Sequence, residues 1–184
     1  DSNPCRRPST PNEPFVTLIV SPLRDVDTVV RFRRPSHLIT LLDPHLMGEA
    51  PRFFPDRHLK VPVDDIWAPA EGMVLPHAGL VDRILDFGRT WDASAPLLVH
   101  CWAGVSRSTA TAFILACERN PETPELTIAQ ALRKASSAAS PNPLLVQLAD
   151  DMLGRKGRMV DAVSAIGKGV YAYPGAPFEL GVKY

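Results

Sequence analysis

The chain has 184 residues, 45% hydrophobic and 22% charged, a composition typical of one globular domain and unlike that of disordered or fibrous chains. Lysine plus arginine and aspartate plus glutamate both total 20, and the resulting net charge of zero argues against a general nucleic-acid or acidic-membrane binder. No apolar run approaches the roughly 18 residues of a membrane span, and we expect a cytoplasmic protein with no membrane or nucleic-acid partner.

The first half of the chain is predicted to be an arm followed by alternating strands and helices. Four prolines in residues 1–14 resist packing, which favours a flexible arm. Ser21 and Pro22 suit the N-cap and first turn of a helix that follows an apolar strand. In chain order, the predictions are strand 15–20, a helix from Pro22, strands 37–42 and 59–63, and amphipathic helix 80–91.

The second half continues this alternation around an apolar centre. Residues 96–100 show no polar alternation, as expected for a central strand covered on both faces. The next helix, 108–117, is almost wholly small or apolar and should pack against the sheet. The remaining predictions are helices at 128–135, at 143–152 with Asn142 as N-cap, and at 159–166, and then a C-terminal tail or surface arm at 168–184.

This order of elements indicates an α/β domain at 15–167. We expect a central, mostly parallel sheet of four to five strands flanked by helices. Ligands of such sheets bind beyond the carboxyl ends of the strands. Asp65 and Cys101 both lie at such ends of predicted strands.

The stretch His-Cys-Trp-Ala-Gly-Val-Ser-Arg-Ser at 100–108 lies between the central strand and the apolar helix. Successive backbone amides that enter a helix N-terminus form a cradle for an anion such as phosphate, and they also stabilise a Cys101 thiolate. Gly104 allows a tight backbone path, and the planar guanidinium of Arg107 can bind two phosphate oxygens. Ser108 can donate to the sulfur, and His100 can brace the loop from behind.

This stretch resembles the phosphate loop of the cysteine-based protein tyrosine phosphatase superfamily, in which His-Cys is followed by five residues, Arg, and Ser or Thr. The dual-specificity branch is similar in its Gly-x-x-Arg-Ser run, and small bacterial members are closest over residues 15–166. The resemblance implies the fold of that family, Cys101 as nucleophile, a phosphorylated protein or peptide as substrate, and no cofactor. The implied phosphate-binding residues are Trp102, Ala103, Gly104, Val105, Ser106 and Arg107.

The family also needs a general acid on a separate loop before the cysteine. Asp64 and Asp65 fit, and Asp65 is favoured because the second acidic position is the acid in similar members. Trp67 follows the pair, whereas the classical enzymes have a tryptophan before the acid, so the choice between the two stays open. The Ser-Pro-Asn run at 140–142 resembles a dual-specificity motif in which the asparagine, here Asn142, supports the site.

Other interpretations of these residues remain. A sulfurtransferase also uses a cysteine in an anion-binding loop, but Arg107 followed by Ser108 argues against it. A phosphate-binding pseudophosphatase would need a blocked mouth at Trp102 or a misplaced acid. A lone cysteine inside an apolar helix, such as Cys117, is usually inert. His100 next to Cys101 does not indicate a zinc site, because the sequence has no second pair of ligands at suitable spacing. The leading hypothesis is metal-independent hydrolysis of phosphate monoesters, protein phosphotyrosine foremost, through a phosphocysteine.

Overall fold

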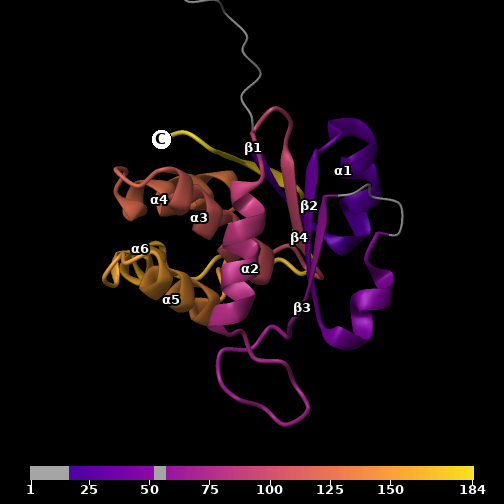
Figure 1. Cartoon of the computed structure of the whole chain (residues 1–184), viewed down its shortest axis with the longest axis horizontal. Coiled ribbons are helices and arrows are strands. Elements are labelled where there is room, and N and C mark those ends of the chain that lie inside the picture. The colour runs from indigo at the N-terminus through magenta and orange to yellow at the C-terminus, as the bar shows by residue number, and fades with distance from the viewer. Residues whose placement is uncertain (1–16, 52–56) are drawn as a thin grey trace, which may run out of the picture.

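The computed structural model describes residues 17–51 and 57–184. The predicted arm at 1–14, Cys5 and the first two residues of the predicted strand 15–20 lie outside the described residues. A sheet forms the centre of the molecule (Figure 1). It has five strands in the order β3-β2-β4-β1-β5. The strands are β1 (Thr17–Pro22), β2 (His37–Leu42), β3 (His58–Pro62), β4 (Leu97–Cys101) and β5 (Phe178–Gly181).

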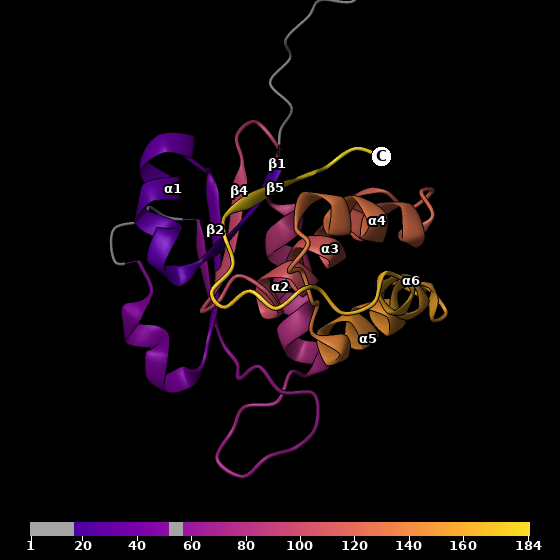
Figure 2. The same cartoon turned by 180° about the vertical axis from the view of Figure 1, so that it is seen from behind.

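The first four strands are parallel, and β5 pairs antiparallel with β1 at one edge. Helix α1 (Val26–Arg33) covers one face of the sheet, and the remaining helices cover the other (Figures 1 and 2). Those helices are α2 (Ala78–Arg89), α3 (Arg107–Arg119), α4 (Glu125–Ala135), α5 (Pro143–Met152) and α6 (Arg158–Ile166). The predicted α/β class and mostly parallel sheet are therefore confirmed.

The core lies where β4 and α3 meet. All five residues of β4 are buried, as a strand between two parallel neighbours requires. Residues 107–117 of α3 are buried as well, and the many small side chains among them, seven of which are alanine, serine, threonine or cysteine, let the helix lie against the sheet. Fully burying each large apolar side chain contributes about 1.5–3 kcal/mol. This packing fixes the loop that joins β4 to α3.

Two parts of the fold differ from the prediction. Pro22 does not open a helix; it is the last residue of β1, paired with Cys101, and α1 begins four residues later after the 3-10 turn Leu23–Asp25. The chain stays extended here because the Leu23 amide donates to the Trp102 carbonyl at 3.1 Å. Residues 178–181, where no strand was predicted, complete the edge of the sheet.

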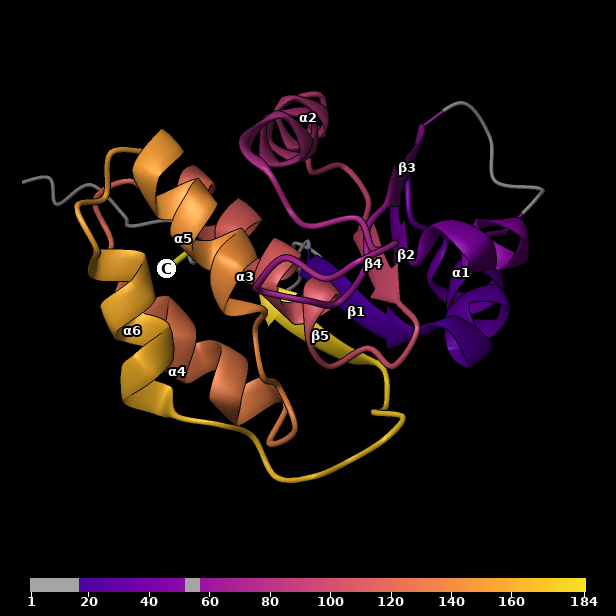
Figure 3. The same cartoon turned by 90° about the horizontal axis from the view of Figure 1, so that it is seen from below.

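Three loops meet beyond the carboxyl ends of the parallel strands (Figure 3). They are the β4–α3 loop, the long connection from β3 to α2, which crosses in front of α3, and the C-terminal segment that leads from α6 to β5. In residues 17–51 and 57–184, no helix combines the length and apolar character needed to cross a membrane.

Candidate active site

The β4–α3 loop has its carbonyls turned outward. Backbone amides of four surrounding positions donate to them: Leu23 to Trp102 (3.1 Å), Gly175 to Ala103 (2.9 Å), Ser140 to Val105 (2.9 Å) and Asn142 to Ser106 (3.3 Å). In a trans peptide the N–H points opposite to the C=O. The amides that follow these carbonyls therefore face the inside of the loop, as in an anion-binding nest.

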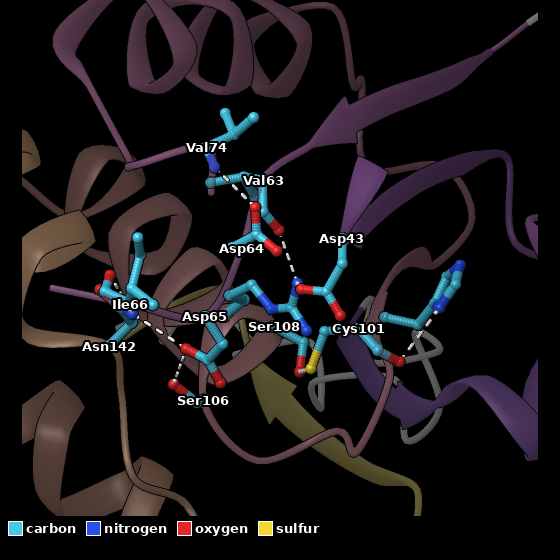
Figure 4. Close-up of polar contacts among 12 residues, drawn as sticks. Asp43, Val63, Asp64, Asp65, Ile66, Val74, Cys101, Ser106, Ser108 and Asn142 are labelled. Atoms are coloured by element: carbon cyan, nitrogen blue, oxygen red, sulfur yellow. Dashed lines mark hydrogen bonds and ion pairs between the residues drawn. The ribbon is translucent and has the colours of Figure 1, made fainter. Parts of the chain in front are cut away.

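The Cys101 sulfur lies inside this loop (Figure 4). The Gly104 amide donates to Sγ at 3.2 Å, and the Ser108 hydroxyl lies 3.1 Å from the same sulfur. Gly104 has a φ of +71°, and an added Cβ would come within 2.6 Å of the Pro22 nitrogen. Only glycine fits this position, so the loop can close tightly around Cys101, a residue that is 1% exposed.

Arg107 is held from outside the loop. Its Nη1 donates to Oδ1 of Asp43 at 2.8 Å and to the carbonyl of Val63 at 2.6 Å. Its Nε is buried and donates to no atom among the described residues. Because a buried guanidinium N–H without an acceptor is costly, this atom is suited to receive an oxygen anion in the loop.

The two adjacent aspartates have different partners (Figure 4). Asp64 is buried, and its Oδ2 accepts from the amide of Val74 at 2.6 Å, which closes the base of the β3–α2 loop. Asp65 is exposed, and its Oδ1 accepts from the Ser106 hydroxyl at 2.7 Å. Asp65 is thus the aspartate that contacts the β4–α3 loop directly.

Asn142 joins three elements. Its Nδ2 donates to Oδ1 of Asp65 at 2.9 Å and to the carbonyl of Ile66 at 3.2 Å. Its Oδ1 accepts from the amides of Leu144 and Leu145, both at 3.1 Å, so it also caps α5 as predicted. One side chain therefore ties the start of α5 to the loop that carries Asp65.

A cleft of about 340 Å³ opens above Cys101 and Arg107. Its lining combines predicted site residues with others, namely Asp43, His45, Leu46, Asp64, Asp65, Met73, Cys101, Trp102, Ala103, Arg107 and Tyr173. A larger hollow, of about 590 Å³, lies beside α1, but it contains no cysteine. The chemistry is therefore sought in the smaller cleft, whose volume lies within the usual range for ligand pockets.

Comparisons with known proteins find no matching family model and no matching curated protein. Solved structures do match. Human DUSP28 has a TM-score of 0.56 at 17% identity, over 80% of this chain and 99% of that one. The fold is that of the cysteine-based protein tyrosine phosphatases. PTPMT1 is also similar, with a TM-score of 0.57 at 15% identity, over 81% of this chain and 94% of that one. The Cydia pomonella PTP-2 phosphatase has a TM-score of 0.55 at 20% identity, over 74% of this chain and 89% of that one.

In this fold, His100 is buried in β4, next to the start of the loop. Its Nδ1 lies 3.3 Å from the Cys101 carbonyl, which can only accept, so Nδ1 carries the proton. Burial lowers the pKa of His100 to about 4, so the ring is neutral near pH 7 and Nε2 accepts from the Thr40 hydroxyl at 2.7 Å. The Thr40 oxygen, in turn, accepts from Nε2 of His58 at 2.8 Å.

The phosphatase fold also brings in residues that the sequence analysis missed. Asp43 directly follows β2, so the rule that singled out Asp65, a carboxylate after a buried strand, could have found it. Tyr173 carried no such signal, because it belongs to a C-terminal stretch without clear periodicity. Cys117, predicted to be inert, is fully buried in α3, and burial raises the pKa of its thiol.

Proposed function

We propose that this chain hydrolyses phosphate monoesters, with phosphotyrosine in proteins as the substrate, through a phosphocysteine intermediate. The observation that carries the proposal is the position of the Cys101 sulfur, which accepts from the Gly104 amide inside a loop of inward-facing amides. Such a loop stabilises both a thiolate and the phosphate that it attacks. The fold shared with tyrosine and dual-specificity phosphatases supports the same chemistry.

In the first step, the Cys101 thiolate attacks phosphorus and the bond to the leaving oxygen breaks. The loop amides and the free Nε of Arg107 bind the phosphoryl oxygens, where charge is concentrated in the transition state. We propose that Asp65 donates its proton to the leaving oxygen. Since Ser106 and Asn142 both donate to Oδ1 of Asp65, the proton resides on Oδ2.

In the second step, water attacks the phosphorus of the phosphocysteine. Asp65, now ionised, takes the proton of that water, and the sulfur–phosphorus bond breaks to release inorganic phosphate. The Ser108 hydroxyl, 3.1 Å from the sulfur, donates to the departing thiolate. The covalent intermediate divides one difficult displacement into two easier ones.

The cleft favours a substrate with one phosphate. One of the similar structures is PTPMT1 in complex with PI(5)P, which raises a phosphoinositide as an alternative substrate. Among the described residues that line the cleft, Arg107 is the only lysine or arginine, and three aspartates lie beside it. Because additional phosphates would meet carboxylates there, a singly phosphorylated protein side chain fits better.

The test compares Cys101→Ser with wild type on an aryl phosphate, and measures tungstate binding to both proteins. The serine variant should lose turnover and keep tungstate binding, because the anion is bound by amides and Arg107. Cys117→Ser serves as a control and should leave the rate unchanged. Sulfur transfer from thiosulfate by the wild type would favour a sulfurtransferase. Tungstate binding by a wild type that shows no turnover would favour a phosphate-binding module. Loss of wild-type activity in EDTA would favour a metal-dependent enzyme.

A further inference from the structure

The C-terminal segment places an aromatic side chain at the mouth of the cleft. The ring of Tyr173 stacks on the ring of Trp102, with centroids 5.2 Å apart and planes 21° from parallel. Both residues line the cleft that contains Cys101. Tyr173 remains 61% exposed and Trp102 38% exposed, so the pair leaves apolar surface open to the cleft.

Tyr173 is held between fixed points on either side. The Gly175 amide donates to the Ala103 carbonyl at 2.9 Å, and Nη2 of Arg24 donates to the Gly175 carbonyl at 3.4 Å. On the other side, the Val170 amide donates to the carbonyl of Ser137 at 2.9 Å. Beyond Gly175, the chain enters β5 and pairs with β1. Tyr173 therefore lies on an anchored strap rather than on a free tail.

The depth of the nucleophile sets the length of the substrate side chain. The Cys101 residue is only 1% exposed, and Trp102 and Tyr173 line the same cleft, so a phosphoryl group that reaches the sulfur enters beside this aromatic pair. A phosphotyrosine side chain is long and contains a rigid ring between the backbone and the phosphate. In phosphoserine, by contrast, only one carbon and one oxygen separate the phosphorus from the backbone. Aromatic rings stack favourably in offset arrangements, and the exposed surface of this pair can receive one.

We propose that Tyr173, together with Trp102, forms an aromatic wall that binds the phenyl ring of phosphotyrosine. The inference rests on the proposed function and adds a specificity-determining residue to it. Tyr173 contacts the substrate ring and not the reacting atoms, so its role is in binding. The ring, rather than the hydroxyl, makes the contact, and Tyr173→Phe should therefore retain it.

The test measures the dissociation constants of phenylphosphonate and methylphosphonate by calorimetry, since neither is hydrolysed. Tyr173→Ala should weaken phenylphosphonate binding roughly 2- to 10-fold, as the loss of one aromatic pair predicts, and should leave methylphosphonate unchanged. Tyr173→Phe should bind both ligands like wild type. Tyr171→Ala is the matched control, because this tyrosine lies two residues away, is 94% exposed and does not line the cleft.

Kinetics provide a second readout. Tyr173→Ala should raise KM for a phosphotyrosine peptide by a similar factor, with kcat unchanged and kcat/KM for a phosphoserine peptide unaffected. Tighter phenylphosphonate binding by Tyr173→Ala would overturn the proposal, because Tyr173 would then obstruct access to the site. Equal weakening of both phosphonates would overturn it too, because the residue would then act through the loop. If neither phosphonate bound to wild type, the phosphatase proposal itself would fail.

Discussion

The Ser106 hydroxyl donates a 2.7 Å hydrogen bond to Oδ1 of Asp65, which joins the β4–α3 loop to the loop that carries the proposed acid. Asn142 donates to the same oxygen at 2.9 Å. Both bonds hold Oδ1 and so fix the Asp65 carboxyl group at the cleft. The geometry therefore couples the position of the proposed acid to the β4–α3 loop.

The first prediction separates the two aspartates. Asp65→Asn should lower kcat for a phosphotyrosine peptide by about 10²- to 10⁴-fold, the usual contribution of a general acid, and flatten the basic limb of the pH–rate profile. Esters whose leaving groups need little protonation should suffer less. Asp64→Asn is the control: its side-chain oxygen can still accept from the Val74 amide. If Asp64→Asn alone showed the leaving-group dependence, the two roles would have to be exchanged.

The second prediction separates the two tasks of Asn142. Asn142→Ala should destabilise the fold by about 1 kcal/mol through the lost helix cap and should also slow turnover. Asn142→Ser keeps an N-capping oxygen but is too short to donate to Asp65 and the Ile66 carbonyl. Urea unfolding should show recovered stability for the serine variant, and steady-state rates should stay low. A serine variant as fast as wild type would show that the tether to Asp65 has no role in catalysis.

The third prediction concerns Arg107. Arg107→Lys should weaken tungstate binding by about 10- to 150-fold, since hydrogen bonds to charged groups contribute about 1.5–3 kcal/mol and a lysine ammonium lacks the rigid planar fork of donors of a guanidinium. Asp43→Asn keeps an oxygen that can accept from Nη1 of Arg107, so it should weaken tungstate binding far less. Calorimetric titration checks both variants. Equal losses would mean that the negative charge of Asp43, rather than the geometry of the guanidinium, controls binding.

The fourth prediction is a loss of stability in acid due to His100. Burial lowers the folded-state pKa to about 4 from 6.5. Between these values the unfolded chain binds more protons, so this contribution to the free energy of unfolding is present above pH 6.5 and is lost as pH falls towards 4. The full effect is about 3 kcal/mol, of which about 2 kcal/mol is lost by pH 5. Urea titrations at pH 7 and 5 measure it.

His100→Asn is the matched variant for that measurement, because its side-chain amide can still donate toward the Cys101 carbonyl but does not titrate. The decrease in unfolding free energy from pH 7 to 5 should be smaller in this variant than in wild type. An unchanged decrease would assign the acid sensitivity to other groups, such as His37, whose pKa burial also lowers.

The fifth prediction contrasts two cysteines. Iodoacetamide at pH 7 should alkylate Cys101, whose sulfur faces the cleft, and inorganic phosphate should protect it. Cys117 is fully buried in α3 and burial raises the pKa of its thiol, so it should react only in denaturant. Peptide mass spectrometry distinguishes the two sites. Faster labelling of Cys117 than of Cys101 in the folded protein would contradict the assigned nucleophile.

Several features of the fold could be predicted because their causes are local. The apolar run of β4, the small residues of α3 and the Asn142–Pro143 cap each reside in one short stretch of chain. The loop between β4 and α3 is equally local, so its glycine, arginine and serine indicated an anion site without knowledge of the sheet. Pro22 shows the limit: its pairing with Cys101, a long-range contact, outweighed its preference for the first turn of a helix.

The contacts that complete the site depend on tertiary structure alone. Asp43 meets Arg107 across 64 positions of sequence, and Asp65 meets Ser106 across 41, because the strand order brings the ends of β2, β3 and β4 to one edge. Tyr173 reaches Trp102 because the C-terminal segment turns back to pair β5 with β1. The amino-acid sequence by itself indicated the proposed nucleophile and its loop. Pairing between distant strands decided which carboxylates and which aromatic ring surround them.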